Sequence, residues 1–129
     1  NVGNNFLLSP LEMRDFIDTV DSPWVGAYYD VGNTVSLHQG WPQQWIRILG
    51  QRILKVHVKD HQSVGPGVLA GVVGAPLLAG DAINWPEVIK ALREVGYDGY
   101  LTVEISPYKY YPTKLAHDAA ESVDILLSA

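Results

Sequence analysis

The segment ILKVHVKD, residues 53–60, decides the fold class of this chain. Apolar and polar residues alternate along it, which is the period of a β-strand that buries one face. The two faces consist of Leu54, Val56 and Val58 on one side and of Lys55, His57 and Lys59 on the other. Residues 100–105 alternate in the same way, and residues 25–30 do so more loosely. We therefore predict three strands in these segments.

Helical segments separate the predicted strands. Ser9, Pro10 and Glu12 have the arrangement of a capping box at the start of the first helix. We predict helices over residues 10–20, 42–49, 85–95 and 112–127. The first has an apolar face near the helical period, which consists of Leu11, Met13, Phe16, Ile17 and Val20. A helix followed by three strand–helix units is typical of parallel βαβ topology. The prediction is one α/β domain over residues 1–129, with about three parallel strands and four helices.

Two stretches between these elements are predicted to be loops. One runs from residue 31 to Gly40, and the other is the apolar, Gly/Pro-rich segment 62–80. The second stretch is long for a connection in a compact domain. We expect it to act as a lid or to pack on a partner.

Composition excludes several classes of protein. The 129 residues include no cysteine, which excludes disulfide scaffolds, cysteine zinc sites, iron–sulfur centres and thiol nucleophiles. Nine Lys+Arg against fourteen Asp+Glu give 9 − 14 = −5, which argues against a nucleic-acid partner. No apolar run reaches the roughly 18 residues of a membrane span, and no leader pattern is seen at the N-terminus. We expect a cytoplasmic protein with no membrane partner.

Three polar residues stand at or near the carboxyl ends of the three predicted strands: Asp30, His57 and Glu104. In open α/β sheets and α/β barrels, sites lie at those ends of the strands. Two carboxylates and one imidazole suit a hard divalent cation such as Mn²⁺, Mg²⁺, Co²⁺ or Zn²⁺. The pattern therefore predicts a metal site.

Each of these residues also has a structural interpretation. Asp30 precedes Val-Gly-Asn and is a candidate turn cap. His57 lies between two valines, as a core histidine would, and Glu104 is a candidate for an ion pair with Lys55 or Lys59. The equivalent positions of the three residues at three strand ends favour the metal site.

Other polar residues are candidates for contact with a substrate. His38 and His61 fall in predicted loops, where we expect them to be solvated and able to meet a substrate. The pair Lys59-Asp60 is interpreted either as an anion-binding group or as a solvated strand end, and His117 as a surface residue.

Six motifs occur in series along the chain: FLLSPLE (6–12), YDVGN (29–33), GWPQQWIRILG (40–50), KVHVKD (55–60), GDAINW (80–85) and LREVGYDGYLTVE (92–104). The series resembles the C-terminal half of the sugar phosphate isomerase/epimerase family. These are xylose isomerase-like TIM barrels, related to tagatose and ribulose-phosphate 3-epimerases, hydroxypyruvate isomerase and endonuclease IV. The resemblance covers nearly the whole chain and implies a partial, half TIM barrel.

In that family Glu, Asp, His and Glu at successive strand ends hold a divalent metal, often Mn²⁺. By resemblance, Asp30, His57 and Glu104 are the Asp, the His and the last Glu, and the first Glu would immediately precede Asn1. The implied reaction is proton transfer beside the carbonyl of a sugar or sugar phosphate, through an enediolate. Glu104 would be one of two acid/base residues. We also predict that Asn33, Lys59 and His61 bind the substrate.

The chain carries three of the four ligands and one of the two acid/base residues, so we expect it to be inactive or impaired alone. An alternative is a non-catalytic half-barrel with at most residual metal or sugar binding. In either case the open sheet edges predict a homo-oligomer. Repair chemistry like that of endonuclease IV is disfavoured, since those enzymes use more His ligands and the charge of −5 does not suit DNA.

Overall fold

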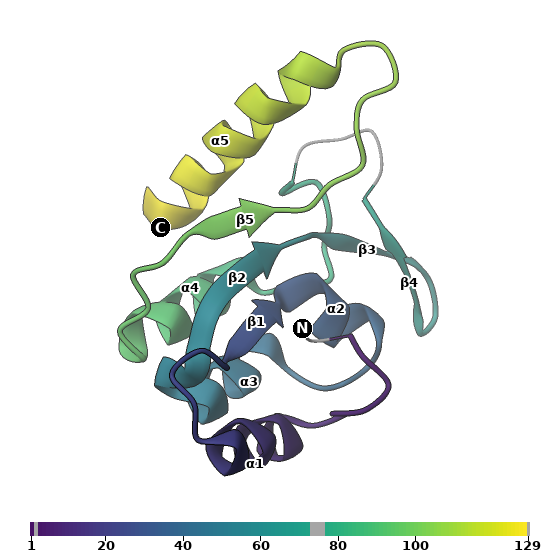
Figure 1. Cartoon of the computed structure of the whole chain (residues 1–129). Helices are drawn as coiled ribbons and strands as arrows, with labels where there is room; N and C mark the ends of the chain where they lie inside the picture. The colour runs from purple at the N-terminus through teal and green to yellow at the C-terminus, as the bar shows by residue number, and fades with distance from the viewer. Residues whose placement is uncertain (2, 73–76, 129) are drawn as a thin grey trace.

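A three-stranded parallel sheet runs through the centre of the protein (Figure 1). The structure is a computed structural model and describes residues 1, 3–72 and 77–128. Its elements in chain order are α1 (Pro10–Val20), β1 (Ala27–Asp30), α2 (Val31–Ser36), α3 (Pro42–Leu49), the 3₁₀ turn η1 (Gly50–Arg52), β2 (Ile53–Val58), β3 (His61–Gly65), β4 (Val68–Gly71), α4 (Trp85–Glu94), β5 (Leu101–Val103) and α5 (Pro112–Ser128). The predicted α/β class with alternating parallel strands and helices is confirmed, as a partial TIM barrel.

The sheet has the order β1-β2-β5, so β2 is its central strand. Asp30 of β1 lies opposite His57 of β2, and His57 lies opposite Thr102 of β5. One hydrogen bond continues this ladder beyond β5, because the backbone N–H of Glu104 donates to the carbonyl oxygen of Val58 at 2.9 Å. The register therefore sets the carboxyl ends of all three strands in one row.

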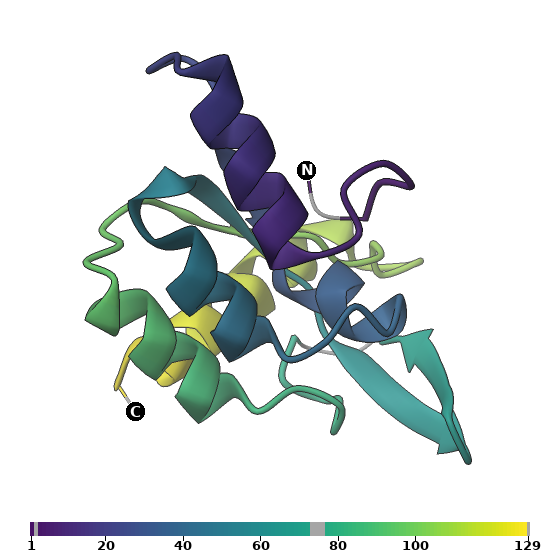
Figure 2. The ribbon, with the colours of Figure 1, turned by 90° about the horizontal axis from the view of Figure 1, so that it is seen from below.

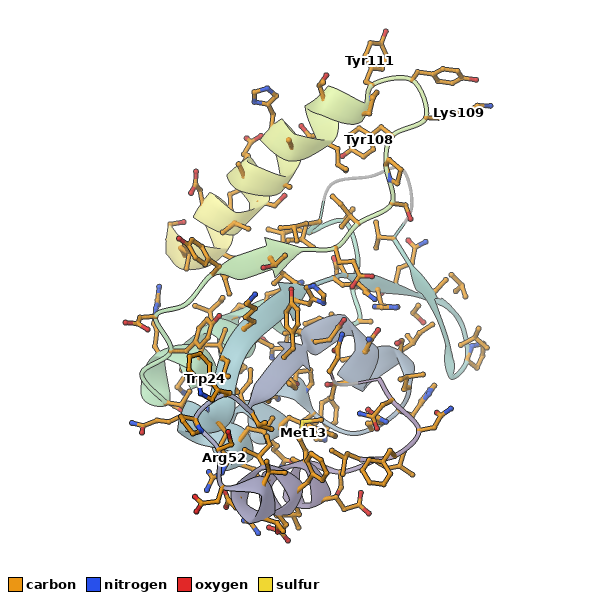
Figure 3. All side chains as sticks on the ribbon, in the orientation of Figure 1. Met13, Trp24, Arg52, Tyr108, Lys109 and Tyr111 are labelled. Carbon is orange, nitrogen blue, oxygen red and sulfur yellow. The ribbon has the colours of Figure 1, made fainter. Side chains whose placement is uncertain are left out.

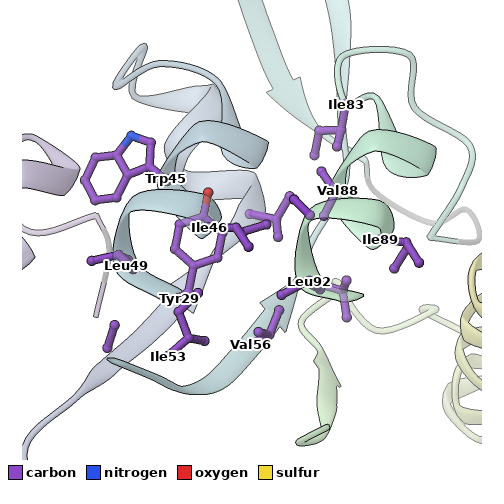
Figure 4. Packing of buried hydrophobic residues seen from close by; sticks show 14 of the residues in the cluster. Tyr29, Trp45, Ile46, Leu49, Ile53, Val56, Ile83, Val88, Ile89 and Leu92 are labelled. Carbon is purple, nitrogen blue, oxygen red and sulfur yellow. The ribbon is translucent and has the colours of Figure 1, made fainter. Parts of the chain in front are cut away.

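Helices α3 and α4 cover one face of the sheet. Tyr29 and Val56 point from the strands into side chains of these two helices (Figure 4). The helix side of this core consists of Trp45, Ile46 and Leu49 from α3 and of Val88, Ile89 and Leu92 from α4. These positions recur every three or four residues, which is the period of a helix that buries one stripe. The other face of the sheet carries the polar row.

The predicted inward face of β2 is wrong at its first position. Ile53 is 5 % exposed, whereas Leu54, which was expected to be buried, is 52 % exposed. The register between β1 and β2 shifts by one residue between Ala27 and Tyr28, so β2 carries an extra residue at that point. The alternation expected from the sequence holds only beyond this irregularity.

Both predicted loops contain regular structure. Residues 31–36 form α2, because the Asp30 side chain accepts from the backbone N–H of Asn33 and caps the helix. Residues 61–71 form most of an antiparallel hairpin, β3–β4, in which Gly67 has a φ of 69°. Gly67 can adopt that left-handed conformation because it lacks a Cβ atom. With α2, the described part of the chain holds five α-helices instead of the four predicted. Residues 73–76 of the second predicted loop lie outside the described residues.

Helix α1 begins with the predicted capping box of Ser9 and Glu12. It leans against the body of the protein along one side (Figure 2). Arg52 of η1 holds it by donating twice to the Asp18 carboxylate, at 2.6 and 2.8 Å, and the position of Arg52 near α1 is seen in Figure 3.

The rest of the apolar face predicted for α1 is not covered. Met13 and Ile17 are buried, but Leu11, Phe16 and Val20 are exposed. The expectation that all five face one core is wrong for these three.

The C-terminal helix α5 is joined to β5 by a connection that bears Tyr108, Lys109 and Tyr111 (Figure 3). The hydroxyl of Tyr108 donates to Asp118 of α5 at 2.9 Å, and Lys114 donates to both oxygens of the same carboxylate. These two partners lower the pKa of Asp118. Among the described residues, every helix is too short or too polar to cross a membrane.

Gly32 allows α2 to approach the end of β2, and we expect its replacement to destabilise the protein. A Cβ atom at this position would lie 2.6 Å from the carbonyl oxygen of Lys59. Alanine favours a helix by about 0.5–1 kcal/mol over glycine, but overpacking against a backbone costs about 1–3 kcal/mol. Gly32→Ala should therefore lower the free energy of unfolding in urea titrations. Gly65→Ala is the control, since a Cβ there meets nothing within 4 Å; equal effects would contradict the prediction.

Candidate metal centre

Asp30, the last residue of β1, is fully buried and divides its two carboxylate oxygens between two tasks. Oδ1 accepts a hydrogen bond of 2.7 Å from the backbone N–H of Asn33 at the start of α2. Oδ2 lies 3.6 Å from Nδ1 of His57 and 3.6 Å from Nζ of Lys59. The turn-cap interpretation of Asp30 is thus correct, and it leaves the second oxygen for the site.

His57 projects from the central strand toward the same point. Its Nδ1 lies 3.4 Å from Oε2 of Glu104, in addition to its contact with Asp30. The ring of Tyr28 lies against the imidazole, with 4.1 Å between the ring centroids. This aromatic neighbour restricts the orientation of the ring.

Glu104 follows β5 and is the most exposed member of the group, with 52 % of its side chain accessible. Its Oε2 lies 3.2 Å from Nζ of Lys59. The ion pair expected between Glu104 and Lys59 is therefore present. It coexists with the approach of Glu104 to His57.

Three candidate ligand atoms, one each from Asp30, His57 and Glu104, all lie within 4.8 Å of one another. Donors about 2.1 Å from an ion lie at most about 4.2 Å apart, so a small contraction brings the group to ligand distance. Within the described part of the chain, Oδ2 of Asp30 and Nδ1 of His57 are buried and make no hydrogen bond. Buried polar atoms without a partner are costly, and a cation between them would satisfy both. The residues fit a divalent metal.

A cleft of about 380 Å³ opens beside this group. Its lining includes Lys59 and Glu104 of the candidate site, Gly71 at the end of the hairpin, and residues 105–107. Such a volume lies within the usual range for small-ligand sites, roughly 300–1,000 Å³. The cleft gives a small molecule a route to the metal centre.

Two of the three predicted substrate-binding residues lie at the site. Nζ of Lys59 donates to Oδ1 of Asn33 at 3.0 Å, so α2 holds the lysine from one side. Asn33 thus supports both the Asp30 carboxylate, through its backbone, and Lys59, through its side chain.

His61 is placed differently from its prediction. It belongs to β3 and is 7 % exposed, so the expectation of a solvated loop residue is wrong. Its Nδ1 is buried and makes no hydrogen bond with the described residues. Burial lowers the pKa of the imidazole, and the nearby Lys59 ammonium lowers it further. His38 and His117 are exposed, as expected.

Asp60 is not a solvated strand end, because it is 2 % exposed. Its Oδ1 accepts from the backbone N–H of His61 at 2.9 Å, and its Oδ2 accepts from that of Gly80 at 2.8 Å. The indole N–H of Trp85 also donates to Oδ1, at 3.4 Å. Asp60 therefore joins the hairpin to the start of α4, and both its oxygens are occupied.

Comparison with known proteins places this arrangement in a family. Residues 1–129 match the family described as xylose isomerase-like TIM barrel. The chain belongs to the xylose isomerase-like TIM barrel family. That family includes sugar isomerases and epimerases.

Two relatives are much longer than this chain. An uncharacterised protein of Methanocaldococcus jannaschii is 28 % identical over 123 residues, which are 92 % of this chain and 36 % of that protein. The crystal structure of a xylose isomerase domain protein from Planctomyces limnophilus superposes with a TM-score of 0.70 at 23 % identity, over 92 % of this chain and 42 % of that one. The second likeness shows the fold, and the chain spans less than half of either relative.

Sequence reasoning missed two features of this xylose isomerase-like site. Tyr28 was placed on the polar face of its strand but was not recognised as the neighbour of the His57 ring. Its position two residues before Asp30 was the available signal. Ser106 and Pro107 in the cleft wall had no such signal, because they follow β5 in irregular structure.

The lowered pKa of His61 predicts a pH dependence of stability. A histidine whose folded pKa lies below its unfolded value of about 6.5 contributes stability above that value. This contribution is lost as the pH falls through 6.5 toward the folded pKa. The free energy of unfolding should therefore decline between about pH 7.5 and pH 5.5, and His61→Asn should make the decline shallower. Urea titrations across this range measure it. His117→Asn is the control, and the same flattening in both variants would contradict the assignment.

Proposed function

We propose that this chain is part of a metal-dependent sugar or sugar-phosphate isomerase or epimerase that acts by proton transfer through an enediolate. One observation carries the proposal: Asp30, His57 and Glu104 converge at three neighbouring strand ends, with two buried atoms that lack a hydrogen-bond partner. The family supports it, because it includes enzymes of this kind.

Asp30, His57 and Glu104 would hold the metal. The oxygen-rich donor set with one imidazole favours Mn²⁺, and it also suits Mg²⁺, Co²⁺ and Zn²⁺. When bound, a divalent cation stabilises the negative charge that develops on the oxygens of a carbonyl substrate. The ligand atoms of the three residues lie within 4.8 Å of one another, so a small contraction would bring them to ligand distance.

Glu104 is the residue best placed to move a proton. Asp30 is fully buried and bound to the α2 backbone, whereas Glu104 borders the cleft and is half exposed. Its carboxylate would take the proton from the carbon beside the substrate carbonyl, and the electron pair of that C–H bond would pass to the carbonyl oxygen. Return of a proton to the opposite face by the second acid/base residue would give the epimer. Return of a proton to the neighbouring carbon, with transfer of that carbon's hydroxyl proton to the first oxygen, would give the isomer.

Lys59 and Asn33 would orient the substrate. The Lys59 ammonium lines the cleft and offers a charged donor to a hydroxyl, carbonyl or phosphate oxygen. Asn33 holds that ammonium at 3.0 Å.

A second candidate function is a non-catalytic half-barrel that self-associates. Exposed apolar side chains on and beside α1 favour it: Phe6, Leu8, Leu11, Phe16 and Val20. Strands β1 and β5 are the outer strands of the described sheet, and unpaired strand edges promote association between chains. In this reading, the metal group binds a cation without turnover.

Calorimetric titration with Mn²⁺ tests the metal site. We expect saturable binding that is lost in His57→Ala, which removes the ligand nitrogen, and strongly weakened in Asp30→Asn, which removes the negative charge of a buried ligand. His117→Asn, which changes an exposed imidazole on α5, should bind like the wild type. Failure of the folded wild-type chain to bind any of Mn²⁺, Mg²⁺, Co²⁺ or Zn²⁺ would refute the proposal.

Solvent exchange separates the two candidate functions. The Mn²⁺-loaded chain is incubated in D₂O with a panel of ketoses and ketose phosphates, while NMR follows the protons beside the carbonyl. The enzyme reading predicts loss of such a signal, slowed by about 10²–10⁴ in Glu104→Gln. Metal binding without exchange, together with an oligomer in light scattering, would favour the self-associating half-barrel.

A further inference from the structure

The two free carboxylate oxygens of the site face two nitrogen atoms, and only one of these nitrogens belongs to a proposed ligand. Oδ2 of Asp30 and Oε2 of Glu104 each lie near Nδ1 of His57, at 3.6 and 3.4 Å. They also lie near Nζ of Lys59, at 3.6 and 3.2 Å. An ammonium group therefore occupies the neighbourhood of the same two oxygens that a metal ion would bind.

The geometry points to Lys59 as a tethered counter-ion that competes with the divalent cation for Asp30 and Glu104. Binding of the cation releases the ammonium into the adjoining cleft, where it can meet an oxygen of the substrate. This inference rests on the proposed metal site and adds an order of events to it. The metal binds first and makes Lys59 available for the substrate.

Charge is the physical reason for the competition. An ammonium and a divalent cation repel each other strongly at the distance of neighbouring ligands, especially in a partly buried site. In the described structure the lysine partly neutralises two carboxylates, one of them fully buried. A divalent cation bound to both oxygens would neutralise the two carboxylates and so remove their attraction for the Lys59 ammonium.

The surroundings give the displaced ammonium a place to go. Lys59 and Gly71 both line the cleft, and a Cβ added at Gly71 would meet nothing within 4 Å. The lysine side chain has four rotatable bonds, so its ammonium group can move while the backbone stays in place. Asn33 accepts from Nζ at 3.0 Å and provides a second anchor outside the two carboxylates.

Lys55 offers a matched control for this idea. It lies within β2, whereas Lys59 is the first residue after that strand, and it carries the same charge. Its Nζ sits over the Tyr28 ring, 5.8 Å from the centroid. Replacing either lysine by methionine removes one positive charge and keeps the apolar stem, but only Lys59→Met removes a charge that faces the two carboxylates.

Titration with Mn²⁺ in the wild type, Lys59→Met and Lys55→Met is the deciding experiment. Competition predicts that Lys59→Met binds Mn²⁺ about tenfold more tightly than the wild type, within the usual range of coupling between two sites. Lys55→Met should stay close to the wild type. Lys59→Gln serves as a second variant if the methionine form does not fold, because it can still hydrogen-bond to Asn33.

The outcomes separate the two proposals. Wild-type binding with unchanged or weaker binding in both Lys59 variants overturns the counter-ion role and leaves the metal site standing. Equal tightening in Lys59→Met and Lys55→Met also overturns it, since a general charge effect then suffices. Absence of Mn²⁺ binding in all variants overturns both the metal site and this inference.

A second readout follows the ammonium itself. The ¹³Cε signal of Lys59, identified by its absence in Lys59→Met, should shift when diamagnetic Zn²⁺ is added to the wild type. The signal of Lys55 should move much less. A Lys59 signal that stays unchanged at saturating Zn²⁺ contradicts release of the side chain.

Discussion

The Asp30 carboxylate is the interaction on which both the fold and the site depend. One oxygen caps α2 through the backbone N–H of Asn33, and the other oxygen faces His57 and Lys59. The cap fixes where the chain turns after β1, and this turn brings Asn33 to within hydrogen-bond distance of the Lys59 ammonium. A fully buried carboxylate has little freedom to reorient, so the position of the second oxygen follows from the first.

The parallel pairing of the strands aligns the other two candidate ligands, His57 and Glu104, with Asp30. Asp30, His57 and Thr102 form one row of paired positions, and the backbone of Glu104 bonds to Val58 one step beyond it. Apolar and polar side chains alternate along each strand, and the apolar ones pack against the helices on the opposite face. A strand therefore cannot shift its register without moving its apolar side chains out of the core. The core made by α3 and α4 therefore holds the spacing of the metal group.

Features set by local sequence patterns were predicted correctly, whereas features set by contacts between distant segments were not. Alternation in residues 53–60 was enough to place His57 and Lys59 on the open face, because a period of two is a local property. The exposure of Leu54 was not predictable, since it depends on a register shift against β1. Helix α2 was missed because its six residues are too few for a periodic pattern. The burial of His61 depends on β3 pairing with β4, which the Gly/Pro-rich composition concealed.

The burial of Asp30 also gives a physical reason why the proposed metal site would favour a cation. A buried carboxylate is tolerated when positive charge and hydrogen bonds compensate for lost solvation. One backbone N–H satisfies Oδ1, but Oδ2 has only contacts of 3.6 Å with His57 and Lys59. Glu104 adds a second negative charge at the exposed side of the group. Two carboxylates facing one lysine leave the group short of positive charge, and this shortage, more than the identity of any single ligand, gives a divalent cation its advantage there.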